Sequence, residues 1–195
     1  MEMAALQTAI REITEISNEE MLLFTGIATY RILKKGELLL AEDHVCRSVY
    51  LVDRGYLRTW FNKDGEIINL NFTFEGEFTG DLKSALTRQP STYNITAGEN
   101  TSLWVFDLNK LTPEIKSHPT IGRFIRQVTF RMLLASESRA ELLKIYTPAE
   151  RYHFIEQHSP QLLQRISLSQ MASYLAITRK TLSRIRKNKS TGARL

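Results

Sequence analysis

The order of hydrophobic and polar residues changes twice along the chain, and each change marks a different kind of secondary structure. Near the N-terminus, Ser17 and Glu20 have the spacing of a capping box ahead of the apolar residues 21–24, which predicts a short helix. Between about residues 29 and 107, short β-branched, aromatic and aliphatic segments alternate with turn signals. We expect these segments to form antiparallel hairpins of a sandwich or barrel rather than a parallel sheet.

One segment of this β-rich region has the alternation of a half-buried strand. Its apolar positions fall on one face, at Ile68, Leu70, Phe72 and Phe74. The intervening positions are Ile67, Asn69, Asn71 and Thr73. Successive side chains of a strand point to opposite faces, so we expect the first set to face the core and the second set to face water.

After Asp107 the periodicity becomes helical, and the longest periodic run covers about residues 120–145. Its apolar seam, interrupted only by Arg139, consists of Ile121, Ile125, Val128, Met132, Ala135 and Leu142. A helix of this length spans about 39 Å, longer than a small domain needs for its own core. We therefore expect part of the seam to contact a second copy of the chain; the alternative is that it packs only on the β-rich region. Pro148 ends the helix.

Composition shows that the net charge of +5 is unevenly distributed. Residues 151–195 carry nine Lys or Arg against one acid, Glu156, whereas residues 1–150 hold 17 basic and 20 acidic side chains. A basic terminal module on a mildly acidic body is typical of nucleic-acid binding, because phosphate neutralisation releases counterions. A basic, solvated tail is the alternative that composition leaves open.

The sharpest local pattern lies at residues 167–187. Ser167 is placed to cap a first helix, residues 176–178 form a tight turn, and Thr178 is placed to cap a second helix. The apolar positions that would lock the two helices together are Met171, Leu175, Ile177, Leu182 and Ile185, with the small Ala172 at the crossing. This layout predicts a helix-turn-helix.

The second helix of this pair would present a basic strip to solvent. Its outward positions are Arg179, Lys180, Ser183, Arg184 and Lys187. Arginine bonds guanine bidentately, so we expect the strip to meet base edges in the major groove. Phosphate contacts are expected from Ser167, Gln170, Thr178, Ser183, Lys187 and Lys189.

Taken together, these residues resemble the Crp/Fnr family of bacterial transcription regulators over nearly the whole chain. Residues 147–152 and 182–186 are similar to the branch found in Bacteroidetes. The resemblance implies an α+β fold: an N-terminal antiparallel β-roll (a jelly-roll-like double-stranded β-helix) flanked by helices at 1–119, a long dimerisation helix at 120–146, and a winged helix-turn-helix at 147–195. It implies base contacts from Arg179, Lys180 and Arg184, a palindromic operator in double-stranded DNA, a homodimer, and RNA polymerase as a further candidate partner.

Two departures from the family pattern affect these expectations. Ala176 occupies a turn position where the family usually has glycine, which costs on the order of 1 kcal/mol if the backbone there is left-handed. In the sensor, cyclic-nucleotide binders use a glutamate for the ribose and an arginine for the phosphate; here Asp81 and Ser91 take those positions.

The effector pocket implied by the resemblance consists of Gly76, Glu77, Phe78, Thr79, Gly80, Asp81, Leu82, Arg88, Ser91 and Thr92. Arg88 lies three residues upstream of Ser91 and is a substitute for the missing cation, although a solvated loop arginine is the alternative. Without a cation, a buried phosphate would face Glu77 and Asp81 uncompensated. We therefore expect a small-molecule or nucleotide effector other than ordinary cyclic AMP, or no effector.

Other chemistry receives little support. One cysteine, Cys46, supplies neither an internal disulfide nor a cluster site, and the four histidines are scattered, so we expect no metal site. No nucleophile elbow, phosphate-binding loop or paired catalytic histidine accompanies the acids Glu75, Glu77 and Asp81, so we expect no enzyme. Neither an apolar run of roughly 18 residues nor a secretory signal is visible, which predicts a cytoplasmic protein without a membrane partner.

Three hypotheses remain: a ligand-responsive DNA-binding regulator, a constitutive regulator with a vestigial pocket, and a small-molecule-binding module whose basic tail does not read DNA.

Overall fold

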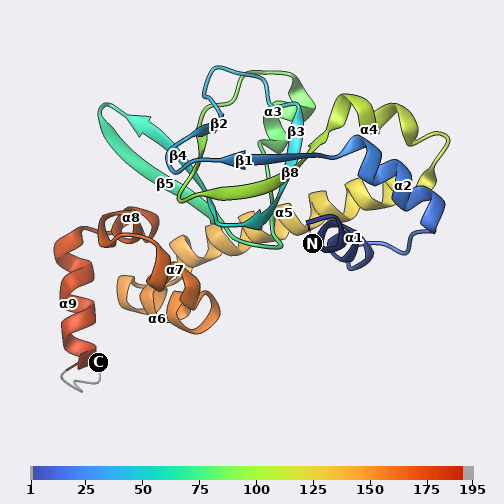
Figure 1. The fold of residues 1–195 in the computed structure, drawn as a ribbon. Coiled ribbons are helices and arrows are strands. Elements are labelled where there is room, and N and C mark those ends of the chain that lie inside the picture. Colours follow the sequence, from blue (N-terminus) through green and yellow to red (C-terminus); the bar gives the residue numbers. More distant parts are fainter. Residues whose placement is uncertain (1, 191–195) are drawn as a thin grey trace.

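The computed structural model describes residues 2–190 and has a β-roll between two groups of helices (Figure 1). Its strands are β1 (Thr29–Leu33), β2 (Leu38–Leu40), β3 (Ser48–Arg54), β4 (Leu57–Lys63), β5 (Glu66–Thr73), β6 (Phe78–Thr79), β7 (Asn94–Ala97) and β8 (Thr101–Asp107). They form two four-stranded sheets, ordered β1-β8-β3-β6 and β2-β7-β4-β5, in which every pair is antiparallel. The expected antiparallel roll is confirmed.

Helices flank the roll on both sides in sequence. They are α1 (Glu2–Arg11), α2 (Asn18–Ile27), α3 (Leu82–Thr87), α4 (Leu108–Glu114), α5 (Pro119–Ile145), α6 (Pro148–His158), α7 (Pro160–Arg165), α8 (Leu168–Tyr174) and α9 (Arg179–Ser190). The predicted capping box begins α2, because the Ser17 hydroxyl accepts from the Glu20 amide and the Glu20 carboxylate accepts from the Ser17 amide. Phe24 of α2 then packs edge-on against Phe124 of α5.

The β4–β5 hairpin is less regular than the strict alternation in the sequence predicts. Its turn residues Asp64 and Gly65 both have positive φ, 52° and 92°, as a two-residue type I′ hairpin turn requires. The pairing of β4 with β5 slips between Thr59 and Trp60, which interrupts the strict alternation of faces. The expectation that the second set of side chains faces water is wrong at Asn69, which is 4% exposed because α8 covers it, and at Thr73, which is 1% exposed.

Helix α5 runs beneath the β-roll, from the side of α1, α2 and α4 to the C-terminal helices (Figure 1). The predicted seam faces this chain itself: Ile121, Val128 and Leu142 are buried in its own cores, and Ile125 and Met132 pack against them. For Ile121, Val128 and Leu142 the expectation of a contact with a second copy is corrected, since the roll and the C-terminal helices already bury them. Ala135 is exposed at the edge of a cavity, and its part in a dimer stays a prediction. The large apolar side chains that α5 exposes are Phe130, Leu133, Leu134 and Ile145.

The C-terminal helices share one core with aromatic residues around the start of β4 and the end of β5. Leu142, Met171, Leu175 and Leu182 pack in the same cluster as Tyr56, Phe72 and Phe74 of the roll. Residues 147–190 contain helices and turns, and no strand lies among them, so the wing expected in 147–195 is not found in the described residues. The physical reason is local: Thr147 and Pro148 begin α6 through a capping box, and α9 continues as helix to Ser190.

Candidate nucleic-acid interface and ligand cavities

Helices α8 and α9 are joined by a turn whose hydrogen bonds form a Schellman motif. The Ile177 amide donates to the Ala172 carbonyl at 3.0 Å, and the Ala176 amide donates to the Ser173 carbonyl at 3.1 Å. Ala176 has φ of 54°, so this turn does require the left-handed backbone for which glycine is usual. The sequence therefore builds the turn at a cost in strain, while Ile177 packs back onto the core.

Both helices begin with the caps that the sequence predicted. The Ser167 hydroxyl accepts from the Gln170 amide, and the Gln170 side chain accepts from the Ser167 amide, which completes a capping box at α8. The Thr178 hydroxyl accepts from the Thr181 amide at 3.1 Å and so caps α9. The helix pair is thus fixed by its ends as well as by its core.

The apolar side of α9 is buried and its basic side is exposed. Leu182 is 1% exposed and Ile185 packs against the same cluster, which fixes the rotation of the helix about its axis. The outward-facing side chains are Arg179, Lys180, Ser183, Arg184 and Lys187. In Figure 1, α9 lies at the end of the molecule farthest from α1 and α2, with its outer side clear of the sheets. The predicted base-contacting residues therefore share one accessible surface.

The residues predicted to contact phosphate are arranged less uniformly. Ser167 and Thr178 are exposed at the N-terminal ends of α8 and α9. Gln170 is half-buried, and its carbonyl accepts from the Asn69 side chain at 3.4 Å, so part of α8 is turned toward the β-roll. The side chain of Lys189 lies outside the described residues.

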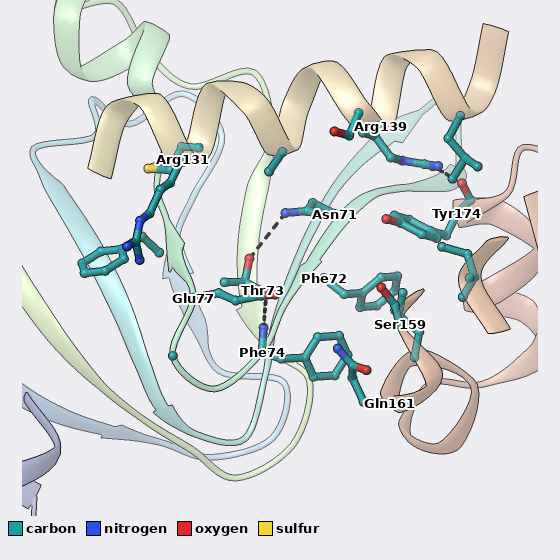
Figure 2. A pocket seen from close by; sticks show the side chains of 18 of the residues that line it. Asn71, Phe72, Thr73, Phe74, Glu77, Arg131, Arg139, Ser159, Gln161 and Tyr174 are labelled. Carbon is teal, nitrogen blue, oxygen red and sulfur yellow. Dashed lines mark hydrogen bonds between the residues drawn. The ribbon is translucent and has the colours of Figure 1, made fainter. Parts of the chain in front are cut away.

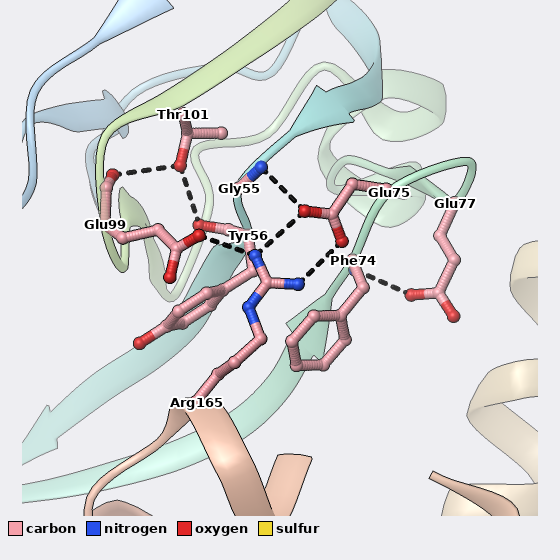
Figure 3. Close-up of polar contacts among 8 residues, drawn as sticks. All are labelled: Gly55, Tyr56, Phe74, Glu75, Glu77, Glu99, Thr101 and Arg165. Carbon is pink, nitrogen blue, oxygen red and sulfur yellow. Dashed lines mark hydrogen bonds and ion pairs between the residues drawn. The ribbon is translucent and has the colours of Figure 1, made fainter. Parts of the chain in front are cut away.

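Arg165 at the end of α7 ties the C-terminal helices to the β-roll (Figure 3). Its guanidinium donates to both carboxylate oxygens of Glu75, at 2.7 and 2.9 Å, and to Glu99 at 2.6 Å. It also lies over the rings of Tyr56 and Phe74. Burial pushes the pKa of Glu75 upward, but the hydrogen bonds and charge of Arg165, with the Gly55 amide, outweigh it and hold that pKa below its ordinary value.

A second polar contact joins α8 directly to the β5 edge. The Asn69 amide donates to the Ser173 hydroxyl at 2.9 Å, and that hydroxyl donates to the Ile67 carbonyl at 3.2 Å. These bonds extend the edge of the sheet onto a helix, since β5 is an edge strand and otherwise leaves backbone groups unpaired. The first helix of the pair is therefore held in a fixed orientation on the roll.

Most of the predicted effector residues surround one cavity of about 370 Å³ between the roll and α5. Its lining includes the predicted positions Phe78, Thr79, Gly80, Asp81, Leu82 and Thr92. At Gly80 only glycine fits, because φ is 156° and an added Cβ would lie 3.0 Å from the Ser48 carbonyl oxygen. Asp81 is buried, and its carboxylate caps α3 by accepting from the Ser84 amide at 2.9 Å. Gly76 and Glu77 line an adjoining cavity, also of about 370 Å³.

Two of the predicted effector residues lie elsewhere. Arg88 is the left-handed C-cap of α3, is exposed and donates from its guanidinium to Asn109 at 3.1 Å. It does not line this cavity, so its role as a substitute cation is corrected and the alternative of a solvated loop arginine is confirmed. Ser91 is buried, and its hydroxyl donates to the Tyr93 carbonyl. Lys83 of α3 lines the cavity, and so does Arg139 of α5, to which the sequence analysis gave no role beyond interrupting the apolar seam. Its signal was visible: a charged residue in register with an apolar seam.

Two further features bear on other functions. No group of three or more His, Cys, Asp or Glu side chains suited to a metal ion occurs within residues 2–190. Over the same residues, none of the helices has the length and apolar character needed to cross a bilayer.

The β-roll matches a known family model: residues 30–118 match that of the cyclic nucleotide-binding domain. Among solved structures, FixK2 from Bradyrhizobium japonicum is 22% identical, with a TM-score of 0.71, over 85% of this chain and 86% of that one. The c-di-GMP responsive global regulator CLP from Xanthomonas campestris is 15% identical, with a TM-score of 0.70, over 90% and 93%. The catabolite activator protein of Thermus thermophilus is 20% identical, with a TM-score of 0.56, over 96% and 90%. No curated protein matches the chain in sequence.

Proposed function

We propose that this chain is a DNA-binding transcription regulator of the Crp/Fnr type, which binds a palindromic operator as a homodimer and responds to a small-molecule effector. The observation that carries the proposal is the basic side of α9, exposed from Arg179 to Lys187 and held outward by the buried Leu182. The fold shared with a catabolite activator protein and with a global regulator supports it. The similarity to the Bacteroidetes branch stays a prediction.

In this function, α9 is the recognition helix of a helix-turn-helix. Arg179, Lys180 and Arg184 read base edges in the major groove, where each good bidentate contact contributes about 1–3 kcal/mol of discrimination. Phosphate contacts come from Ser167, Gln170, Thr178, Ser183, Lys187 and Lys189. They set the position of the helix on the duplex and make binding depend on salt.

The dimer would form through the exposed apolar face of α5. Phe130, Leu133 and Leu134 are 52%, 49% and 62% exposed, and their spacing of three and four residues places them on one side of the helix. Large apolar side chains grouped in this way mark an interaction surface. A second copy of the same helix is the occupant we propose, with the two α9 helices then reaching successive half-sites.

The effector would occupy the cavity between the β-roll and α5. That cavity has the size of a small-ligand site, but Ser91 stands where cyclic-nucleotide binders carry their phosphate-binding arginine. We therefore infer an effector other than ordinary cyclic AMP. A non-enzymatic protein of the cytoplasm fits this function, and RNA polymerase as a partner stays a prediction.

The test is a mobility-shift titration of the full chain with the promoter region of its own gene at several salt concentrations. Affinity should fall steeply as salt rises, since each phosphate contact releases counterions. Replacing Arg179 and Arg184 with alanine should abolish the preference for that DNA over a scrambled duplex.

The matched control is Lys110→Ala with Lys116→Ala, which removes the same charge from exposed positions near α4, at the other end of the molecule (Figure 1). This control should keep the sequence preference. Sequence preference that survives the loss of both arginines excludes the base-reading role. Binding without salt dependence, or no binding, would favour a ligand-binding module that does not read DNA.

A further inference from the structure

Arg139 of α5 stands where the two cavities of the β-roll meet. It lines the cavity between the roll and α5 and also the adjoining one, which reaches α6, α7 and α8. Figure 2 shows its side chain extending from α5 toward Tyr174, across the cavity from Phe72 and Phe74. One guanidinium nitrogen, Nη2, donates to the Tyr174 carbonyl at the end of α8, and the guanidinium stacks 3.7 Å from the centroid of the Tyr174 ring.

The charge of this guanidinium has no carboxylate to balance it within residues 2–190. No carboxylate among the described residues forms an ion pair with it, in contrast to Arg165, which has two. Its other terminal nitrogen, Nη1, is buried, and the part of the chain that the structure describes offers it no acceptor within hydrogen-bonding distance. Burial lowers the pKa of Arg139, the Tyr174 ring opposes this, and the charge of Arg151 lowers it further. A sheltered cation without an anion is costly, so this position carries a cost that the fold alone does not explain.

The walls around Arg139 combine aromatic and apolar side chains with hydroxyl and amide groups, and two further cations line the cavities, Lys83 in one and Arg131 in the other. Phe72, Phe74, Phe154 and Tyr174 line the adjoining cavity, and Met132 and Ala135 line both. The acids that line the two cavities already accept backbone hydrogen bonds: Glu77 from the Phe74 amide, at 2.8 Å, and Asp81 from the Ser84 amide. A ligand suited to this surface therefore has a planar or apolar body and one acidic group for the guanidinium.

We propose that Arg139 binds the acidic group of the effector, and that the effector is a small organic anion, either a phosphate ester or a carboxylate. That the bound anion acts as an effector rests on the proposed function. The acidic chemistry of the ligand rests on the guanidinium of Arg139, which has no carboxylate partner among the described residues. Because the same guanidinium bonds the Tyr174 carbonyl, an anion bound there contacts the group that holds the end of α8. The site thus lies directly between the ligand and the helix pair that would meet DNA.

The test uses the full-length protein and probes that do not require the natural ligand to be known. Inorganic phosphate serves as the general anion, AMP as a phosphate ester, indole-3-acetate as a carboxylate, and adenosine as the uncharged control. NMR follows the Arg139 Nε–H signal, identified by its absence in Arg139→Gln, together with the amides of Tyr174 and Leu175. The matched control is Arg126→Gln, since Arg126 is exposed on the same helix and lines neither cavity.

We expect phosphate to shift the Arg139 signal and the amide signals of Tyr174 and Leu175 saturably. Either AMP or indole-3-acetate should bind more tightly than phosphate. Adenosine, which has no acidic group, should shift none of these signals. Arg139→Gln should weaken that binding about tenfold or more, as expected for a lost charge-assisted hydrogen bond, and Arg126→Gln should leave it unchanged. Arg139→Lys, which keeps the charge without the fork, should weaken it by a smaller factor.

Anions that leave the Arg139 signal unmoved, or bind Arg139→Gln as tightly as the natural sequence, would overturn the assignment. If Arg139→Gln does not fold, the Arg139 signal of the natural sequence and the Arg139→Lys variant still decide the matter. DNA affinity measured without any probe is a separate readout, so a failure of the anion site is distinguishable from a failure of the proposed regulator.

Discussion

Some single residues of this chain have a strained backbone or a buried charge in the folded structure. Ala176 is the clearest case, because it holds φ of 54° at the C′ position of a Schellman motif while its side chain is exposed. An L-residue in this region costs on the order of 1 kcal/mol relative to glycine. Ala176→Gly should therefore stabilise the folded protein by up to about 1 kcal/mol, as measured by urea unfolding, with DNA affinity unchanged.

The opposite sign is expected for the same substitution in a regular helix. Ala140 is exposed in the interior of α5, where glycine is about 1 kcal/mol less favourable than alanine. Ala140→Gly should thus destabilise the protein. A loss of stability in Ala176→Gly would contradict the assignment of strain to this turn.

At the scale of elements, Arg165 couples the C-terminal helices to the β-roll. Its guanidinium is only partly exposed and binds Glu75 bidentately as well as Glu99, so Arg165→Ala should cost about 1–2 kcal/mol. Amide hydrogen exchange should rise first in α7 and α8, since Arg165 joins them to the roll. Glu75 has a lowered pKa in the folded state, so its contribution is present above its unfolded pKa and is lost as pH falls through the folded one. The stability gap between the natural sequence and Arg165→Ala should therefore close in acid.

An exposed pair in the roll provides the control for this contact. Arg31 and Glu37 lie 3.8 Å apart and both are more than 40% exposed, so Arg31→Ala should change stability by less than about 0.5 kcal/mol. If the two substitutions lower the stability of the protein equally, the ion pairs of Arg165 contribute no more than an ordinary exposed pair. If the difference in stability between the natural sequence and Arg165→Ala does not change with pH, the ionised carboxylate of Glu75 does not contribute to it.

The sequence could predict those elements that depend on local patterns, but not the contacts between distant elements. Caps, turns and periodicity are local, and they predicted the capped helices beginning after Ser17, Ser167 and Thr178 as well as the antiparallel strands. Burial of Asn69 was not predictable from its strand, because the helix that covers it comes from about 100 residues later in the chain. The side of α5 that faces its own chain was likewise decided by the roll and the C-terminal helices together.

The ligand site depended on still longer-range information. Spacing from the strand left two roles for Arg88, a substitute cation of the effector cavity or a solvated loop arginine; the turn after α3 leaves it exposed and directs its side chain toward Asn109, in agreement with the second. Arg139 takes that place from a different element, and only the packing of α5 against β5 and α8 brings it there. The exposed basic surface of α9 was easier to predict, since one helix carries all of its residues.

At the scale of the whole molecule, the proposed operator binding requires two copies held by α5. Leu134 is 62% exposed beside Phe130 and Leu133, so a charge at this position would have to be buried, unpaired, in a dimer. Leu134→Glu should therefore shift the protein to monomers in sedimentation velocity while leaving the monomer folded. Affinity for a two-half-site operator should then fall much more than affinity for a single half-site, because only the former depends on the linked second contact.

Ile32→Glu is the matched substitution, because Ile32 is 73% exposed on β1, an edge strand of the β-roll that pairs with β8 and does not belong to the proposed dimer face. It should leave both the mass and the operator affinity unchanged. If Leu134→Glu remains dimeric, the second copy must dock elsewhere, and the exposed face of α5 would need another partner. If the natural sequence is itself monomeric at the concentration where it binds its operator, each α9 must act alone. The palindromic operator would then lose its physical basis, because nothing would link one half-site to the next.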